Sequence, residues 1–235
     1  MKKTKSLLYK YIRYKLKIQS GKIILINTDK EKVRQILKEI LNNSPEFYWY
    51  EGKIKFETKG AFLCIYPHYV YSKKECVEID GFIENAVKKY DKNNYVNELH
   101  FVREIYKELS GAIIYDTTAV HSQNISSALV YGRSVCRGIS KAFQYILQRN
   151  GMLCTLVEGT IDNVERHVWN VVEIYGKYYH IDVTLGCDCF ASLWKNNNGD
   201  VLQNGFFCVS TETIERTHKI QYMPEGVICR QDLIM

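Results

Sequence analysis

A cysteine, a histidine and an aspartate occur in that order in the second half of this chain, at spacings that could bring them together. Cys136 begins a stretch whose apolar residues recur with helical period, and His167 and Asp182 lie in two stretches with the pattern of paired strands. A thiol, an imidazole and a carboxylate are the nucleophile, the base and the orienting group of a cysteine acyl-transfer site. The sequence therefore predicts a catalytic triad of Cys136, His167 and Asp182.

The nucleophile of such a site is the thiolate, and the predicted position of Cys136 favours that form. A helix N-terminus presents unpaired N–H donors and the positive end of the helix dipole to an anion. His167 could pair with the thiolate as an imidazolium, and Asp182 could hold the imidazole in one tautomer. Gly138 and Ser140 are expected to keep the surroundings of the thiol small enough for a substrate backbone.

The nucleophile helix is predicted over residues 136–148, with Ser134 as its N-cap and Asn150-Gly151 as its C-terminal stop. Before it, a helix is expected over residues 96–109, followed by a loop-rich stretch over residues 110–133. Strands are expected at residues 152–157, 167–175, 177–184 and 206–209.

The two strands that carry His167 and Asp182 are expected to form a hairpin. A two-residue turn at Gly176-Lys177 would place Asp182 opposite Val171, on the sheet face that carries His167. About four residues would still separate the two side chains along the ladder. A longer turn, a bulge or strong twist must then close that gap.

Residues 1–92 are expected to form a small α+β unit, and residues 93–235 the domain that carries the chemistry. A capping-box pattern at Thr28 and Glu31 predicts a helix, which strands at residues 47–50, 54–57 and 61–70 and a helix at 79–90 would follow. The best linker is Asp91-Lys92-Asn93-Asn94. No motif in this unit indicates its role, and substrate or partner positioning is our hypothesis for it.

The net charge of +6 comes from the start of the chain. Residues 1–22 contain eight Lys and Arg and no acid, which leaves 24 basic and 26 acidic residues in the remainder. The body is therefore not a basic nucleic-acid-binding surface. The basic start is expected to form a hairpin with a charged outer face, ending in the strand Ile23–Ile26; contact with a membrane surface or RNA is the alternative.

The composition is that of a globular protein, with 46% hydrophobic and 25% charged residues. No apolar run is long enough to span a bilayer, and no secretory signal is seen. We expect a cytoplasmic protein, or an extracellular or cell-surface one if the sequence is a processed form.

Eight cysteines are present without a CxxC motif, so buried thiols are favoured over disulfides. Cys187 and Cys189 are the one close pair, and they could join His180 or Cys208 around a metal. The second close ligand pair of a usual structural zinc site is missing, and no metal or other cofactor is expected.

The blocks at residues 132–138, 167–172 and 178–184 resemble the three signature blocks of the transglutaminase-like superfamily, a branch of the papain-like cysteine enzymes. A looser similarity extends over residues 95–220, including Tyr115-Asp116 and residues 206–209. The resemblance, to bacterial transglutaminase-core proteins, implies an α+β fold with the nucleophile helix packed on an antiparallel sheet. It implies the same triad, and no metal.

The chain departs from the family pattern beside the cysteine. Arg137 stands where bacterial relatives commonly have glutamine, and Ile139-Ser140 replaces a usual Tyr-Ala. These changes alter the rim of the cleft and leave the substrate open. Substrate contacts are expected from Trp169, Tyr131 and Arg137, with Trp169 mainly as a wall beside the base.

The oxyanion donor beyond the Cys136 backbone N–H is not evident, and Tyr131 and Gln123 are the candidates. Among the histidines outside the triad, His180 is expected at the surface or behind the site, and His218 has no partner pattern. Asn170 is expected to face away from His167 as a structural hydrogen-bonding residue.

The predicted function is acyl transfer on peptide or glutamine amides through a thioester. Water as acceptor would make the protein a protease or amidase, and an amine would make it a transglutaminase. Hydrolysis is slightly favoured, because many bacterial members of the family are classed as proteases. The alternatives are a catalytically silent module that binds proteins, and a metal-binding regulatory protein that uses Cys187 and Cys189.

Overall fold

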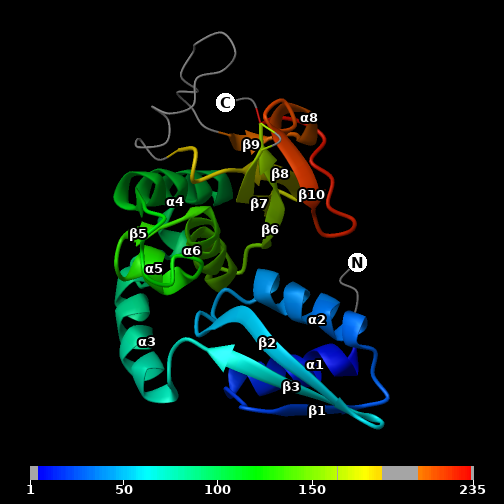
Figure 1. The fold of residues 1–235 in the computed structure, drawn as a ribbon. Coiled ribbons are helices and arrows are strands. Elements are labelled where there is room, and N and C mark those ends of the chain that lie inside the picture. Colours follow the sequence, from blue (N-terminus) through cyan, green and yellow to red (C-terminus); the bar gives the residue numbers. More distant parts are fainter. Residues whose placement is uncertain (1–4, 163, 187–205, 234–235) are drawn as a thin grey trace. The chain divides into compact units, whose positions relative to one another are not determined.

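The computed structural model describes residues 5–162, 164–186 and 206–233, and the chain divides into two compact units between Asp80 and Gly81 (Figure 1). This division lies within helix α3 (Lys73–Val87), and the residues expected to form a linker contain the 3-10 helix η1 (Lys92–Asn94) of the second unit. The assignment of residues 1–92 as a domain with its own role stays a prediction.

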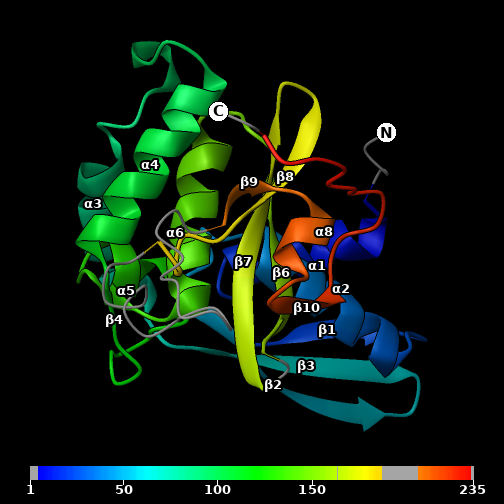
Figure 2. The same ribbon diagram turned by 90° about the horizontal axis from the view of Figure 1, so that it is seen from above.

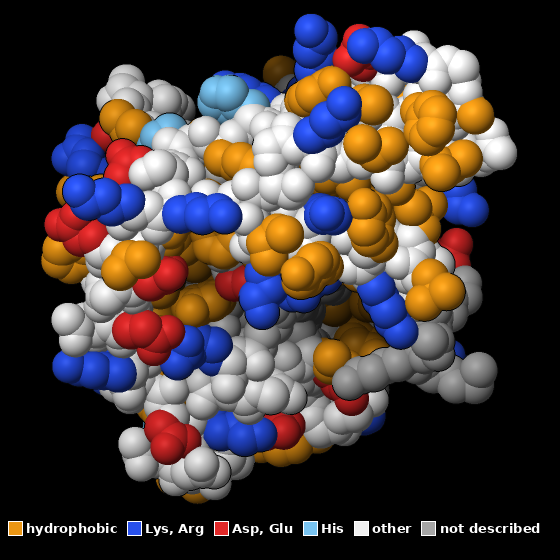
Figure 3. Space-filling view, turned by 90° about the horizontal axis from the view of Figure 1, so that it is seen from below, with side chains coloured by type: hydrophobic (Ala, Val, Ile, Leu, Met, Phe, Trp, Pro, Cys, Tyr) orange, Lys and Arg blue, Asp and Glu red, His pale blue; other side chains and the backbone are white. Residues whose placement is uncertain are grey.

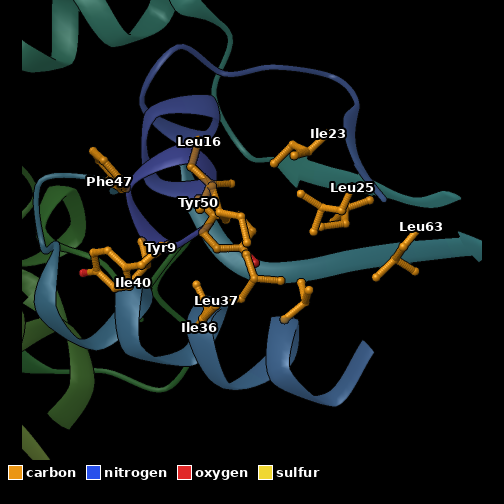
Figure 4. Close-up of a cluster of buried hydrophobic side chains, with 13 residues drawn as sticks. Tyr9, Leu16, Ile23, Leu25, Ile36, Leu37, Ile40, Phe47, Tyr50 and Leu63 are labelled. Atoms are coloured by element: carbon orange, nitrogen blue, oxygen red, sulfur yellow. The ribbon is translucent and has the colours of Figure 1, made fainter. Parts of the chain in front are cut away.

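The first unit packs two helices on a three-stranded antiparallel sheet with the order β1-β3-β2. Its elements are α1 (Leu7–Lys17), β1 (Ile23–Ile26), α2 (Lys30–Asn43), β2 (Tyr50–Lys59), β3 (Phe62–Tyr69) and the start of α3. Figure 4 shows apolar side chains from both helices and the sheet meeting in one core. The core includes Tyr9, Ile12, Leu16, Ile23, Val33, Ile40 and Ile65.

The expected N-terminal hairpin is wrong, because residues 7–17 form a helix. Tyr9, Ile12 and Leu16 are buried at a spacing of three and four residues, which is the period of a helix face. Ser6 caps this helix by accepting a hydrogen bond from the Tyr9 N–H at 3.1 Å. Leu16 and Ile18 alternate with Lys15 and Lys17, which favours a strand, but this alternation is shorter than the helical period before it.

Helix α2 is confirmed, although its cap is Asp29 and not Thr28. The Asp29 carboxylate accepts a hydrogen bond from the Lys32 N–H at 2.7 Å.

On the outward side of the sheet, Ile24, Ile26 and Phe62 are exposed. In the view of Figure 3 exposed apolar side chains are interspersed with Lys and Arg side chains.

The second unit contains a five-stranded antiparallel sheet with the order β10-β6-β7-β8-β9. The strands of this sheet are β6 (Cys154–Ile161), β7 (Glu165–Ile174), β8 (Lys177–Ile181), β9 (Phe207–Val209) and β10 (His218–Tyr222). Two further strands of the unit, β4 (Ile114–Tyr115) and β5 (Arg133–Ser134), form a separate two-stranded sheet. The further helices of the unit are α4 (Glu98–Ala112), α5 (Ile125–Leu129), α6 (Cys136–Arg149) and α8 (Thr211–Ile214).

Helix α6 packs on β6 and β7 of this sheet, and α4 lies beside α6 (Figure 2). Its apolar face buries Ile139, Phe143 and Leu147, as the helical period predicts. The predicted α+β fold, with the nucleophile helix on an antiparallel sheet, is confirmed. Among the described residues, no helix is long and apolar enough to cross a membrane.

The stretch expected to be loop-rich contains more order than predicted. Between α4 and α6 the chain forms helix α5 and the two short strands β4 and β5, which pair in parallel. Two-residue strands are too short to produce a recognisable alternation, so their pairing depends on tertiary contacts. This region directly precedes Cys136 and leads into helix α6.

Candidate active site

Cys136 is the first residue of α6, as predicted, but the cap differs from the expectation. The N-cap is Val135, without a side-chain cap bond. Ser134 lies in β5, where its hydroxyl donates to the Ser122 carbonyl at 2.7 Å and lies 2.6 Å from the Ser127 hydroxyl. Ser134 therefore anchors the segment before the helix, and neither Ser134 nor the N-cap residue Val135 caps the first turn of α6 with its side chain.

Gly138 and Ser140 are small for reasons of packing, which corrects our expectation. A Cβ on Gly138 would lie 2.1 Å from Ser134 Oγ and 2.4 Å from the Ser122 carbonyl oxygen. The buried Ser140 hydroxyl donates to the Val168 carbonyl at 2.9 Å. Both residues bring the helix close to its neighbours and do not clear space for a substrate.

The hairpin between β7 and β8 has the predicted face but not the predicted register. Its turn residues are Tyr175 and Gly176, with φ of 52° and 74°, the signature of a type I′ turn. Val171 pairs with His180, and Asn170 pairs with Ile181. Continuing this register by one residue places Asp182, just beyond β8, opposite Trp169. This register brings Asp182 two residues closer to His167 than the predicted one, and no bulge is needed.

His167 and Asp182 are in direct contact in the interior of the second unit. The His167 Nε2 lies 2.6 Å from Asp182 Oδ2, and the two side chains are 3% and 0% exposed. The other carboxylate oxygen of Asp182 accepts hydrogen bonds from the N–H groups of Thr184 and Leu185, at 2.9 and 3.2 Å. Burial opposes ionisation of this carboxyl, but the histidines that bond to it hold the pKa of Asp182 well below its usual range.

The Cys136 thiol interacts with the same imidazole. It is 8% exposed, and it hydrogen-bonds with the His167 ring, whose Nε2 already faces Asp182. Burial alone would lower the pKa of His167, but Asp182 and the Cys136 thiol outweigh burial and raise that pKa to about 10. The three predicted residues therefore lie together, with an imidazole that keeps its second proton through neutral pH.

His218 belongs to the same group of side chains, and no motif pointed to it. Its Nε2 lies 3.1 Å from Asp182 Oδ2, and its Nδ1 lies 2.8 Å from the Thr217 hydroxyl. His218 is the first residue of β10, a strand in the C-terminal part of the chain that pairs with β6. Asp182 thus accepts hydrogen bonds from two histidines through one oxygen atom.

Trp169 forms a wall beside His167, as expected, and it is fully buried. Its ring is stacked at 18° on that of His167, and its Nε1 donates to His180 Nδ1 at 3.0 Å. His180 is therefore behind the site and not at the surface. Burial, followed by the nearby His218, lowers the pKa of His180 to about 4, so its ring is a neutral acceptor.

The remaining predicted site residues are near the surface. Tyr131 is 59% exposed, and Gln123 is exposed. Arg137 forms a partly buried ion pair with Glu158 of β6 at 2.9 Å.

As expected, Asn170 is a structural residue: its side-chain amide donates to the Ser140 carbonyl at 3.0 Å.

The cysteines that the structure describes are free and buried, as predicted: Cys64, Cys76, Cys136, Cys154, Cys208 and Cys229. Cys187 and Cys189 lie outside the described residues.

His167, Asp182 and His218 are also a set of ligand atoms that could hold a metal ion, since these atoms lie within 4.8 Å of one another. Their hydrogen bonds, however, already explain the arrangement. Each Nε2 faces the same carboxylate oxygen, which is the bond pattern of two neutral or protonated imidazoles around one acceptor.

Comparison with known proteins gives two kinds of match. The model of the transglutaminase-like superfamily matches residues 85–183. Among solved structures, a TGase is 14% identical over 69% of this chain and 51% of its own, with a TM-score of 0.42. A candidate cysteine protease from Cytophaga hutchinsonii is 11% identical over 56% of this chain and 61% of its own, with a TM-score of 0.39.

This chain thus spans between one half and two thirds of the length of those two structures. A comparison with curated proteins gives no match. The family match includes Cys136, His167 and Asp182, and it ends before β9 and β10. Residues 85–183, which make up less than half of the chain, are thus similar to the transglutaminase-like superfamily.

Proposed function

We propose that this protein is a cysteine-dependent acyl-transfer enzyme that acts on peptide or glutamine amides. The observation that carries the proposal is the buried contact of His167 with Asp182 at 2.6 Å, on an imidazole that also bonds to the Cys136 thiol. These are the contacts that a nucleophile, its base and the orienting carboxylate require. Three separate parts of the fold position them: the start of α6, strand β7 and the residue directly after β8.

The reaction begins with the thiolate of Cys136 paired with the imidazolium of His167. The sulfur attacks the carbonyl carbon of the amide, an S–C bond forms, and the π pair moves onto oxygen. When the C=O bond forms again, the C–N bond breaks and His167 gives its Nδ1 proton to the leaving amine. The acyl group then remains on Cys136 as a thioester.

The second half of the reaction needs an acceptor that His167 can deprotonate. Water yields a carboxylic acid, and an amine yields a new amide; either restores the thiolate–imidazolium pair. We favour water slightly, and protein or peptide substrates. Asp182 keeps its charge throughout, because its low pKa prevents it from taking the proton.

The substrate side of the site is proposed to involve Tyr131 and Arg137. Tyr131 is exposed, and Arg137 follows the nucleophile directly while its ion pair with Glu158 limits its freedom. Trp169 is fully buried, so we assign it to holding the imidazole and excluding water.

A catalytically silent module that binds proteins is the second candidate function. The near burial of Cys136 favours it, because at 8% exposure the thiol offers little surface to a large substrate. Such a module would show no turnover on any amide, and it would retain partner binding when Cys136 is replaced.

Reaction with p-nitrophenyl acetate tests the proposal without knowledge of the natural substrate. We expect a burst of nitrophenolate and an acetyl group that peptide mass spectrometry locates on Cys136, with both lost in Cys136→Ala. Cys64→Ala, which removes a buried thiol of the first unit, should behave as the wild type. Decay of the adduct in water, with and without a primary amine, then ranks the acceptors. Absence of any adduct on Cys136 would favour the silent module.

A further inference from the structure

Tyr115 is held close to the nucleophile by the smallest sheet in the second unit. Strand β4 pairs in parallel with β5, and Tyr115 lies opposite Ser134, two residues before Cys136. The Asp116 N–H donates to the Ser134 carbonyl at 2.9 Å and extends this ladder. The segment that begins helix α6 therefore carries Tyr115 beside it as a fixed neighbour.

An ion pair fixes the same ladder from the side. Arg133 Nε lies 2.8 Å from Asp116 Oδ2, and the other Asp116 oxygen accepts hydrogen bonds from the N–H and the hydroxyl of Thr118. Thr118, followed by Arg133, lowers the pKa of Asp116 to about 2, so the carboxylate is charged at any working pH. Both sequence neighbours of Tyr115 are therefore held in place: Ile114 by pairing in the strand, and Asp116 by its bonds to Arg133 and Thr118.

The Tyr115 side chain contacts the nucleophile directly. Its ring packs against the cluster of Cys136, Leu156 and Val168. Its hydroxyl hydrogen-bonds with the Cys136 thiol and with the Cys136 backbone N–H. Burial, followed by the charge of Cys136, raises the pKa of Tyr115, so the phenol keeps its proton and is a donor throughout the working range.

The Cys136 thiol therefore interacts with two groups, the His167 imidazole and the Tyr115 phenol. The phenol also meets the Cys136 N–H, which is the backbone group nearest to an oxyanion on the attacked carbon. The sequence had left this second donor open, with Tyr131 and Gln123 as candidates. Both of these side chains are exposed, whereas Tyr115 is partly buried against the thiol.

We propose that Tyr115 is the second oxyanion donor of the site, together with the Cys136 N–H; this inference rests on the proposed acyl-transfer function. When the sulfur attacks, the carbonyl oxygen gains the π pair and takes the place of the phenol oxygen as acceptor of the Cys136 N–H. The Tyr115 O–H turns from the sulfur to this oxyanion and keeps its proton. When the C=O bond forms again and the leaving group departs, the phenol returns to its resting contacts.

Two probes separate this role from a simple effect on the thiol. p-Nitrophenyl acetate reacts through a tetrahedral oxyanion, whereas iodoacetamide loses iodide in a displacement that forms none. In Tyr115→Phe we expect acetylation of Cys136 to be about 100-fold slower, the usual effect of removing one oxyanion donor. Alkylation of Cys136 at the same pH should stay close to the wild-type rate, and the melting temperature should show that the variant is folded.

Tyr14→Phe is the matched control, because it removes the same hydroxyl from an exposed tyrosine of the first unit. It should leave both rates unchanged. An equal loss of acetylation and alkylation in Tyr115→Phe would overturn the proposal and assign Tyr115 to holding the thiol. Unchanged or faster acetylation would also overturn it. If Cys136 of the wild type reacts with neither probe, the proposed function fails and this inference fails with it. That outcome is distinguishable from a change in rate that is seen only in Tyr115→Phe.

Discussion

Asp182→Asn is expected to lower the rate of Cys136 acetylation by about 1,000-fold while the protein still folds. The carboxylate accepts hydrogen bonds from His167, His218 and two backbone N–H groups, and it makes the imidazolium of His167 stable in the interior. An amide has one acceptor oxygen for these four donors, and its NH2 group favours the wrong tautomer of the histidine. The measurement is the nitrophenolate burst rate at fixed pH.

The same substitution should change how stability depends on pH. The pKa of Asp182 is lowered in the folded protein, so its contribution to stability is present above the unfolded value of about 4 and is lost as the pH falls below it. Asp182→Asn should therefore flatten the acid limb of the stability curve obtained from urea unfolding.

Asp162→Asn is the control for both measurements. Asp162 is exposed in the turn after β6, at a φ of 48° that asparagine tolerates well. It should retain the wild-type rate and the wild-type acid limb. If Asp182→Asn also retains the wild-type rate, the assignment of Asp182 as the orienting group is wrong.

Gly159→Ala is expected to destabilise the protein by about 3 kcal/mol and to slow acetylation of Cys136, although it touches no reacting group. Gly159 lies in β6 directly opposite His167 on β7 and opposite Ile220 on β10. A Cβ there would lie 2.2 Å from the Lys219 carbonyl oxygen and 2.9 Å from the Trp169 ring. The strand that delivers His218 and the wall of the imidazole would both have to move. Urea unfolding and the burst rate measure the two effects.

Gly111→Ala is the matched control, since Gly111 lies in helix α4 with no atom within 4 Å of the added methyl group. Alanine in a helix is favoured over glycine by about 1 kcal/mol, so this variant should be slightly more stable, with unchanged acetylation. Equal stability of Gly159→Ala and the wild type would show that β10 does not press on β6 as described.

Local patterns in the sequence were sufficient for the parts of the site that lie on long elements. The apolar period of α6 placed Cys136 at a helix start, and the alternation of β7 and β8 put Asp182 on the face of His167. The register was wrong by two residues because Tyr175 adopts a positive φ. A non-glycine residue rarely does so, and the turn was therefore expected one position later.

The parts of the site that sequence reasoning missed are those made by contacts between distant segments. His218 reaches Asp182 only because β10 returns to pair with β6, and nothing near His218 in the chain indicates a partner. Tyr115 was noted only within the looser family similarity. Its approach to Cys136 depends on two strands of two residues each, which produce no periodic signal.

The central claim is that Cys136 and His167 form a thiolate–imidazolium pair, and cysteine alkylation tests it most directly. Iodoacetamide labelling of each cysteine is followed by peptide mass spectrometry across a pH series, in the wild type and in His167→Ala. Because the pKa of His167 is raised to about 10, the imidazolium persists through neutral pH. We predict fast labelling of Cys136 at pH values well below 7, where ordinary thiols are protonated, and loss of this advantage in His167→Ala. Labelling of Cys136 no faster than that of an ordinary thiol in both proteins would contradict the account.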